Sequence, residues 1–193
     1  MEKPQFTGLS HVCIFVDDVE QAFDYYARIL GAVPVQLIPH WKNKGFFQAG
    51  GFIDEAERGD VSIGFMSVPG TRLTIELMCY HYPVGRKEPL FFKANDVSGV
   101  RHVALKVENV DEAFEYIKAQ PDVTLVNSSD AYRAFQISKT RPDDFRFLDA
   151  AKEANMPAKE QAAEILSNTR YFYFIDKYGT QWEFEQGHTD IGD

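Results

Sequence analysis

An internal repeat constrains the fold of this 193-residue chain more than any other feature of its sequence. When the sequence is shifted by 91 positions, residues 8–12 (GLSHV) align with residues 99–103 (GVRHV). The match continues without a gap, because Val16, Val19, Ala22, Phe23 and Tyr25 align with Val107, Val110, Ala113, Phe114 and Tyr116. Such a repeat indicates one supersecondary unit that is present twice, so we expect a fold built from two similar modules.

Each copy begins with a predicted strand that is followed by a predicted helix. Residues 11–16 are rich in β-branched and aromatic residues and are largely apolar on both alternating faces, as in a sheet covered on both sides. Asp17 and Asp18 provide a helix N-cap, and apolar residues then recur at the spacing of a helix that ends at Gly31. Three further predicted strands complete a βαβββ module, at residues 34–40, 61–68 and 72–80.

The second copy repeats this pattern, with predicted strands at residues 123–126, 170–175 and 180–185. A linker that is rich in Pro and Gly, residues 83–98, separates a first module at residues 1–82 from a second at residues 99–193. We therefore predict an α+β protein made of two βαβββ modules. The second module also contains an insert at about residues 128–168, which is too apolar for a simple flexible loop and is helical over residues 158–166.

Composition excludes several classes of protein. With 45% hydrophobic residues the chain can bury a sizeable core, and its net charge of −9 repels nucleic acid and anionic membranes. The two cysteines are too few for a disulfide scaffold, which favours a reducing compartment. Since no apolar run approaches the length of a membrane span, we expect a cytoplasmic protein.

Four residues at matching positions of the two copies point to a metal site. His11 and His102 begin the first strand of each copy, and Glu76 and Glu183 lie in the final strands. A single strand histidine is usually structural and a single strand glutamate usually faces solvent. Here each glutamate stands between bulky apolar neighbours, where an unpaired carboxylate is costly, and the whole arrangement recurs. Two imidazoles and two carboxylates around a divalent metal ion satisfy that requirement.

The sequence resembles the vicinal oxygen chelate superfamily, which includes glyoxalase I, methylmalonyl-CoA epimerase and the extradiol dioxygenases. The resemblance rests on residues 9–12 (LSHV), 100–103 (VRHV) and 174–184 (FIDKYGTQWEF), the last with Lys177 at the usual proline position. It implies that the two modules pair as a cupped, eight-stranded mixed sheet with helices outside and a metal ion inside. It also implies the metal ligands His11, Glu76, His102 and Glu183, and a homodimer.

This ligand set is most similar to that of glyoxalase I and the epimerase group, which implies a metal-dependent lyase or isomerase. In such an enzyme a proton moves next to a metal-bound carbonyl through an enediolate or enolate, with Glu183 or Glu76 as the base. The ion would be Zn, Ni, Co, Mn or Fe, and the substrate a small carbonyl compound or hydroxy acid. The alternatives are an acyl-CoA or sugar-acid epimerase, an extradiol-type dioxygenase, or a resistance protein that binds a metabolite or drug. Ligands split between the halves argue against oxygen activation, and the intact set argues against the binding protein.

Other features carry weaker hypotheses. His40, Trp41, His81, Tyr82 and Arg86 could touch a substrate, although ordinary rim positions are at least as plausible. A basic cluster at the start of the insert could hold an anion, or could be a solvated surface; it consists of Arg133, Lys139 and Arg141. The insert could form a lid or extend a dimer contact. Because it would reshape the cleft, it puts a glutathione-type substrate in doubt.

Overall fold

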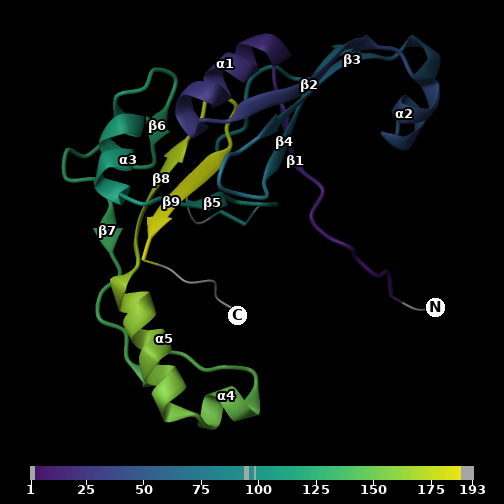
Figure 1. Cartoon of the computed structure of the whole chain (residues 1–193). Coiled ribbons are helices and arrows are strands. Elements are labelled where there is room, and N and C mark those ends of the chain that lie inside the picture. Colours follow the sequence, from purple (N-terminus) through teal and green to yellow (C-terminus); the bar gives the residue numbers. More distant parts are fainter. Residues whose placement is uncertain (1–2, 94–95, 98, 188–193) are drawn as a thin grey trace. The chain divides into compact units, whose positions relative to one another are not determined.

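The computed structural model describes residues 3–93, 96–97 and 99–187, and the chain divides into two compact units, Met1–Pro89 and Leu90–Asp193 (Figure 1). Each unit contains one mixed sheet together with helices, so the predicted α+β class is confirmed. In the described part of the chain, no helix is both long enough and apolar enough to cross a membrane.

The first unit is a βαβββ module with a short helical segment between its second and third strands. Its sheet has the order β1-β4-β3-β2, in which β1 and β4 are parallel and the other pairs are antiparallel. The elements are β1 (Val12–Phe15), α1 (Val19–Leu30), β2 (Val33–Trp41), α2 (Lys44–Ala49), the 3₁₀ turn η1 (Ala56–Arg58), β3 (Asp60–Ser67) and β4 (Thr74–Tyr82).

The second unit repeats this topology and adds the insert. Its sheet has the order β5-β9-β8-β6, with β5 parallel to β9 and with β7 also paired to β8. The elements are β5 (Val103–Lys106), α3 (Val110–Lys118), β6 (Thr124–Leu125), β7 (Phe135–Gln136), the 3₁₀ turn η2 (Pro142–Asp144), α4 (Ala150–Ala154), α5 (Met156–Asn168), β8 (Arg170–Ile175) and β9 (Gln181–Gln186). The predicted repeat is therefore present in the topology as well as in the sequence.

The helix boundaries follow the capping chemistry of the sequence. Asp18 is the N-cap of α1, where its carboxylate accepts a hydrogen bond of 2.9 Å from the backbone N–H of Gln21. Gly31 ends the helix in the left-handed region at φ 63°, as predicted. Asn109 caps α3 in the same way, by accepting from the N–H groups of Asp111 and Glu112.

The two faces of the first sheet have different coverings. Helix α1 covers one face so closely that Val19 and Phe23 leave no room for a side chain at Gly64. Because side chains alternate along a strand, Glu76, Met78 and Tyr80 of β4 share the opposite face with their register partners Phe65, Ile63 and Val61 of β3.

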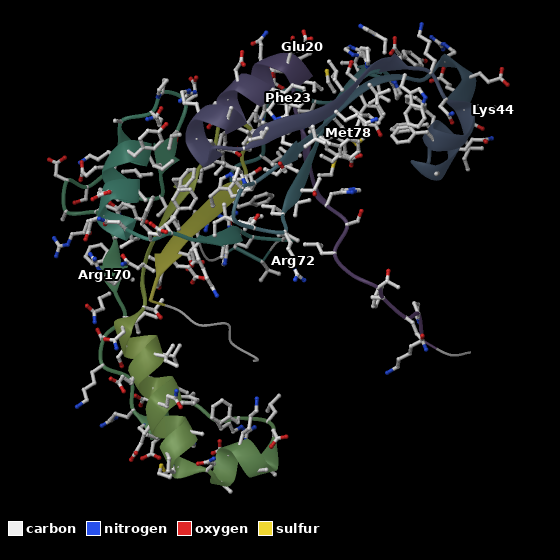
Figure 2. All side chains as sticks on the ribbon, in the orientation of Figure 1. Glu20, Phe23, Lys44, Arg72, Met78 and Arg170 are labelled. Atoms are coloured by element: carbon white, nitrogen blue, oxygen red, sulfur yellow. The ribbon has the colours of Figure 1, made fainter. Side chains whose placement is uncertain are left out.

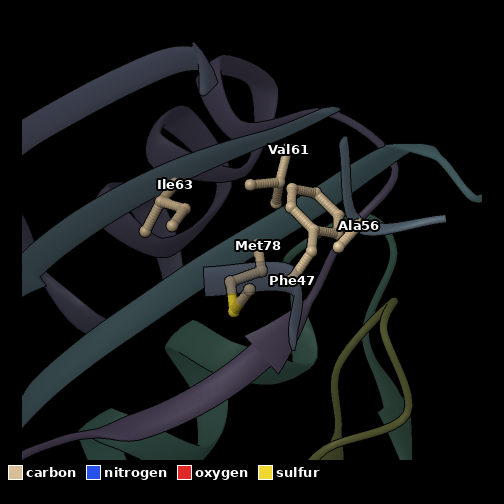
Figure 3. Packing of buried hydrophobic residues seen from close by; sticks show 5 residues of the cluster. All are labelled: Phe47, Ala56, Val61, Ile63 and Met78. Atoms are coloured by element: carbon tan, nitrogen blue, oxygen red, sulfur yellow. The ribbon is translucent and has the colours of Figure 1, made fainter. Parts of the chain in front are cut away.

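Part of that second face is covered by a segment that the sequence pattern leaves as a loop. Asn43 caps α2, and Phe47 of this helix is fully buried against Ala56, Val61, Ile63 and Met78 (Figure 3). A helix of six residues is too short for hydrophobic periodicity to reveal it, and tertiary packing stabilises it instead.

The insert forms a helical arm that extends from β7 of the second sheet (Figure 1). Helix α5 confirms the predicted helical tail, with a proline in its first turn. A buried cation holds the arm together, because the Lys159 ammonium, whose side chain is 7% exposed, donates to the Glu153 carboxylate at 2.7 Å. The insert is therefore an ordered element of the second unit.

Candidate metal-binding residues

The first unit brings one of the predicted pairs together. His11 immediately precedes β1 and Glu76 lies on β4, which runs parallel to β1. The distance from His11 Nε2 to Glu76 Oε2 is 3.1 Å, and the Ser10 hydroxyl lies 3.1 Å from His11 Nδ1. The Phe65 ring packs edge-on against the imidazole at 6.2 Å between centroids. Glu76 is the more enclosed partner, with 12% of its side chain exposed against 37% for His11.

The second unit brings the other predicted pair together in the same way. His102 immediately precedes β5, and its Nε2 atom lies 3.0 Å from Oε2 of Glu183 on β9. The exposed fractions are again 37% for the imidazole and 10% for the carboxylate. The Tyr173 ring lies 5.3 Å from the imidazole, between centroids.

The strand register explains why both units give the same geometry. In the first sheet Glu76 is paired with Cys13 on one side and with Phe65 on the other. In the second sheet Glu183 is paired with Ala104 and Tyr173. The histidine lies two residues before Cys13 or Ala104, and therefore on the same face as the glutamate. The duplicated topology alone places one imidazole beside one carboxylate in each unit.

The neighbours of the two carboxylates differ chemically. Beside Glu76, desolvation of the Cys13 thiol raises its pKa to about 12, with smaller contributions from the Glu76 charge and from a hydrogen bond to that carboxylate. Beside Glu183, burial raises the pKa of the Tyr173 hydroxyl well above its ordinary value. The charge of Glu183 and the hydrogen bond from the Tyr173 hydroxyl to the Glu183 carboxylate raise this pKa further. Both groups therefore remain protonated at neutral pH and can donate to their carboxylate.

The donor atoms of each pair fit a divalent metal ion. Imidazole nitrogen and carboxylate oxygen suit zinc and its neighbours in the first transition series. Two adjacent ligands at about 2.1 Å from an octahedral ion stand about 3.0 Å apart. The separations of 3.1 Å and 3.0 Å in the two pairs agree with that distance.

Sequence reasoning missed two polar contacts of these carboxylates. Cys13 is recognisable from the strand alternation as sharing a face with His11, but its hydrogen bond to Glu76 is not. Tyr173 carries no motif, and only the register of β8 against β9 places it opposite Glu183.

The remaining candidate residues lie elsewhere. His40 and His81 are close together on the α1 side of the first sheet, where their rings stack at 4.2 Å between centroids. In the basic cluster, the Arg133 guanidinium lies over the Phe135 ring, and Arg141 pairs with Asp144 at 3.5 Å. These two arginines thus have local partners, and the anion site stays a prediction.

Comparison with known proteins identifies the family of this chain and several of its relatives. The family model described as "Glyoxalase/Bleomycin resistance protein/Dioxygenase superfamily" matches residues 8–128. Human mitochondrial methylmalonyl-CoA epimerase is 30% identical over 112 residues, which are 57% of this chain and 52% of that protein. The ethylmalonyl-CoA/methylmalonyl-CoA epimerase of Cereibacter sphaeroides is also 30% identical over 112 residues, 57% of this chain and 68% of that protein. The match spans about half the length of the mammalian relatives.

Solved structures share the fold at low sequence identity. A glyoxalase family protein from Bacillus cereus superposes with a TM-score of 0.63 and 15% identity, covering 96% of this chain and 97% of that one. A glyoxylase/bleomycin resistance protein/dioxygenase domain from a Frankia species gives a TM-score of 0.53 and 14% identity, over 95% and 100% of the two chains. At such identities the likeness concerns the fold alone.

Proposed function

This chain belongs to the glyoxalase/bleomycin resistance protein/dioxygenase superfamily, and on that premise we propose that it is a divalent-metal-dependent isomerase. The proposed reaction moves a proton at the carbon next to a substrate carbonyl. The observation that carries the proposal is the imidazole–carboxylate pair that recurs at equivalent strand positions, with nearly equal distances of 3.1 Å and 3.0 Å.

We propose that both pairs serve the same ion, so that His11, Glu76, His102 and Glu183 are its ligands. The matched geometry of the pairs and their donor types support this assignment. When bound, the ion supplies a Lewis acid for the substrate carbonyl oxygen. The homodimer and the cytoplasmic location expected from the sequence stay predictions.

The chain itself supplies the groups that move the proton. A carboxylate is a competent base for a carbon acid that lies next to a polarised carbonyl, and Glu76 and Glu183 are both candidates. Cys13 and Tyr173 donate hydrogen bonds to these carboxylates and hold them in place. His11 and His102 would hold the ion through Nε2, which lies beside the same carboxylates.

The most economical substrate is a 2-substituted acyl-CoA thioester, and the reaction would be epimerisation at carbon 2. Two relatives at 30% identity are named as epimerases of methylmalonyl-CoA or ethylmalonyl-CoA, which supports this choice over a glutathione thiohemiacetal. Phe65, which is paired with Glu76 and packs against the His11 ring, would suit a short aliphatic substituent.

The test combines metal analysis with exchange at carbon 2. Purified protein is assayed for bound metal and for deuterium incorporation from D₂O into methylmalonyl-CoA, with the methylglyoxal–glutathione adduct as a second substrate. We expect His102→Ala to lose the ion that supports activity, and Glu183→Gln to retain metal while losing turnover. Glu115→Gln, which changes an exposed acid on α3, is the matched control and should behave as wild type.

Each outcome has a definite consequence. Full activity of both Glu183→Gln and Glu76→Gln would remove the glutamates from the role of base. Turnover of the glutathione adduct without exchange into methylmalonyl-CoA would favour a lyase of the glyoxalase I type. Protein without a stoichiometric metal would contradict the proposal and favour a binding protein of the resistance type.

A further inference from the structure

We propose that His40, Asp60 and His81 form a second metal site, which takes a transition-metal dication such as Zn²⁺. It lies entirely within the first unit, on β2, β3 and β4. This inference does not depend on the proposed isomerase activity.

The three side chains already converge. One ligand atom from each residue lies within 4.8 Å of the other two. His40 Nδ1 stands 3.2 Å from both carboxylate oxygens of Asp60, and the His40 and His81 rings stack at an angle of 24°. Two imidazoles and one carboxylate, with positions left for water, form a donor set suited to zinc and related ions.

The strand geometry separates this cluster from the first pair. Glu76 and Tyr80 share one face of β4, so His81, the residue after Tyr80, points to the opposite face. Ser62 of β3 lies on that opposite face and contacts His81. Asp60 lies two residues before Ser62 on β3 and therefore shares its face. His40 reaches the same face because the pairing of β2 with β3 shifts between Ile38 and Trp41, and such a bulge redirects a side chain.

The backbone of His40 is held in an uncommon conformation. Its φ is 48°, in the left-handed region, and it lies where the pairing of β2 with β3 shifts between Ile38 and Trp41. A non-glycine residue in this region is strained, and such residues persist where surrounding contacts fix them, often at ligand sites. Here the His40 N–H donates to the Ser62 hydroxyl oxygen at 3.3 Å.

Ser62 also fixes the second imidazole. It is a buried residue whose Oγ lies 2.8 Å from His81 Nε2. A hydrogen bond to one ring nitrogen sets the orientation of the ring and leaves the other nitrogen for a metal, as outer-shell partners of metal-bound histidines do.

The surrounding charges favour a cation. His40 and His81 line a hollow beside the start of α1, where Asp17 and Glu20 also line it; Figure 2 shows Glu20 on the first turn of this helix. Lys42 is a competing cation, since its Nζ lies 3.8 Å from Asp60 Oδ2. The Lys42 side chain is 67% exposed, so it can move into solvent when an ion binds.

A bound ion would connect the end of β2 to β3 and β4. The chain continues from β2 directly into α2, whose Phe47 is buried on the far face of the sheet. The site would therefore stabilise α2, whose Phe47 packs against Val61, Ile63 and Met78.

The test is a calorimetric titration of zinc chloride into the His11→Ala/His102→Ala variant of the full chain, from which the proposed catalytic ion is absent. We expect one Zn²⁺ to bind per chain. Adding His40→Ala, Asp60→Asn or His81→Ala should weaken this binding at least about tenfold, because even the loss of an outer-shell partner costs a metal site that much. Lys42→Gln should tighten the binding, because it removes the cation beside Asp60. Glu57→Gln is the neutral control, since this exposed carboxylate of η1 pairs with Lys44 instead.

Metal counting in the otherwise unmutated protein separates this site from the proposed catalytic one. We expect two ions per chain there, and one ion after either His81→Ala or His102→Ala. One ion that disappears with His102→Ala and persists with His81→Ala would overturn the second site and leave the proposed function intact. Zinc binding unchanged by all three ligand substitutions, in variants with wild-type circular dichroism, would also overturn it.

Discussion

Replacement of Phe47 by alanine should remove a large part of the stability of the first unit. The side chain is fully buried, and its ring packs against Phe46, Phe52 and Tyr80 at 5.5, 6.1 and 5.9 Å between centroids. Deleting such a ring costs the transfer free energy of the lost atoms plus a cavity term, together about 3–5 kcal/mol. Since whole domains are stable by about 5–15 kcal/mol, this one change would remove about a fifth of the total or more.

Urea unfolding at 25 °C, followed by circular dichroism, measures the effect. Phe47→Ala should lower the unfolding midpoint at a nearly unchanged denaturant slope. Phe91→Ala, at a ring that is 64% exposed, is the control and should change the free energy of unfolding by less than about 0.5 kcal/mol. A loss below about 1 kcal/mol for Phe47→Ala would refute the docking of α2 on the sheet.

Gly59 provides an independent check of the same packing. A methyl group at this position would fall on the Phe47 ring, where it would meet Cγ, Cδ1 and Cδ2. Gly59→Ala alone should therefore cost about 1–3 kcal/mol through overpacking. In the Phe47→Ala background the methyl group would enter the cavity, so the double variant should be more stable than the sum of the two losses predicts. If the two losses of unfolding free energy were strictly additive, the close approach of Gly59 to the Phe47 ring would be contradicted.

Two further predictions concern the second unit. Asp176→Ala should lower the free energy of unfolding by about 3 kcal/mol or more in the same urea assay. The reason is that the buried carboxylate accepts hydrogen bonds from Trp182 Nε1 and from the Tyr178 N–H, each at 2.9 Å. A change below about 0.5 kcal/mol would contradict a stabilising role of these hydrogen bonds. Asp111→Asn should lower the melting temperature at pH 7 and have no effect well below the ordinary aspartate pKa. Arg170 donates to both Asp111 oxygens at 2.7 Å and lowers the pKa of that carboxyl in the folded state. The contribution of this ion pair to stability is therefore present above the unfolded-state pKa of Asp111 and is lost as the pH falls through the folded-state pKa. An equal difference between variant and wild type at pH 7 and pH 2 would refute this account.

The sequence allowed the fold to be predicted because its signals are local and occur twice. The repeat, the Asp18 cap and Gly31 determine where strand, helix and turn follow one another, and the structure confirms the two βαβββ modules. The short helix α2 was not predictable, since six residues show too little periodicity and depend on the burial of Phe47.

The candidate sites were predictable only in part. The closeness of His11 to Glu76 follows from matched strands, and the same holds for His102 and Glu183, whereas their sharing of one ion stays a prediction. The approach of His40 to Asp60 depends on a local register shift of β2 against β3. No pattern of residue types along the chain encodes such a shift.

The unequal neighbours of the two glutamates have a consequence for how this protein can be altered. The duplication places Glu76 and Glu183 at equivalent positions of the two sheets. Cys13, which is paired with Glu76, has a thiol, whereas its counterpart Ala104, which is paired with Glu183, has only a methyl group. Across the strand, an aromatic ring without a hydroxyl faces one acid, at Phe65, and a phenol faces the other, at Tyr173. Evolution or an engineer can thus change the hydrogen-bond donor beside either acid through one adjoining side chain, without a substitution next to the other acid.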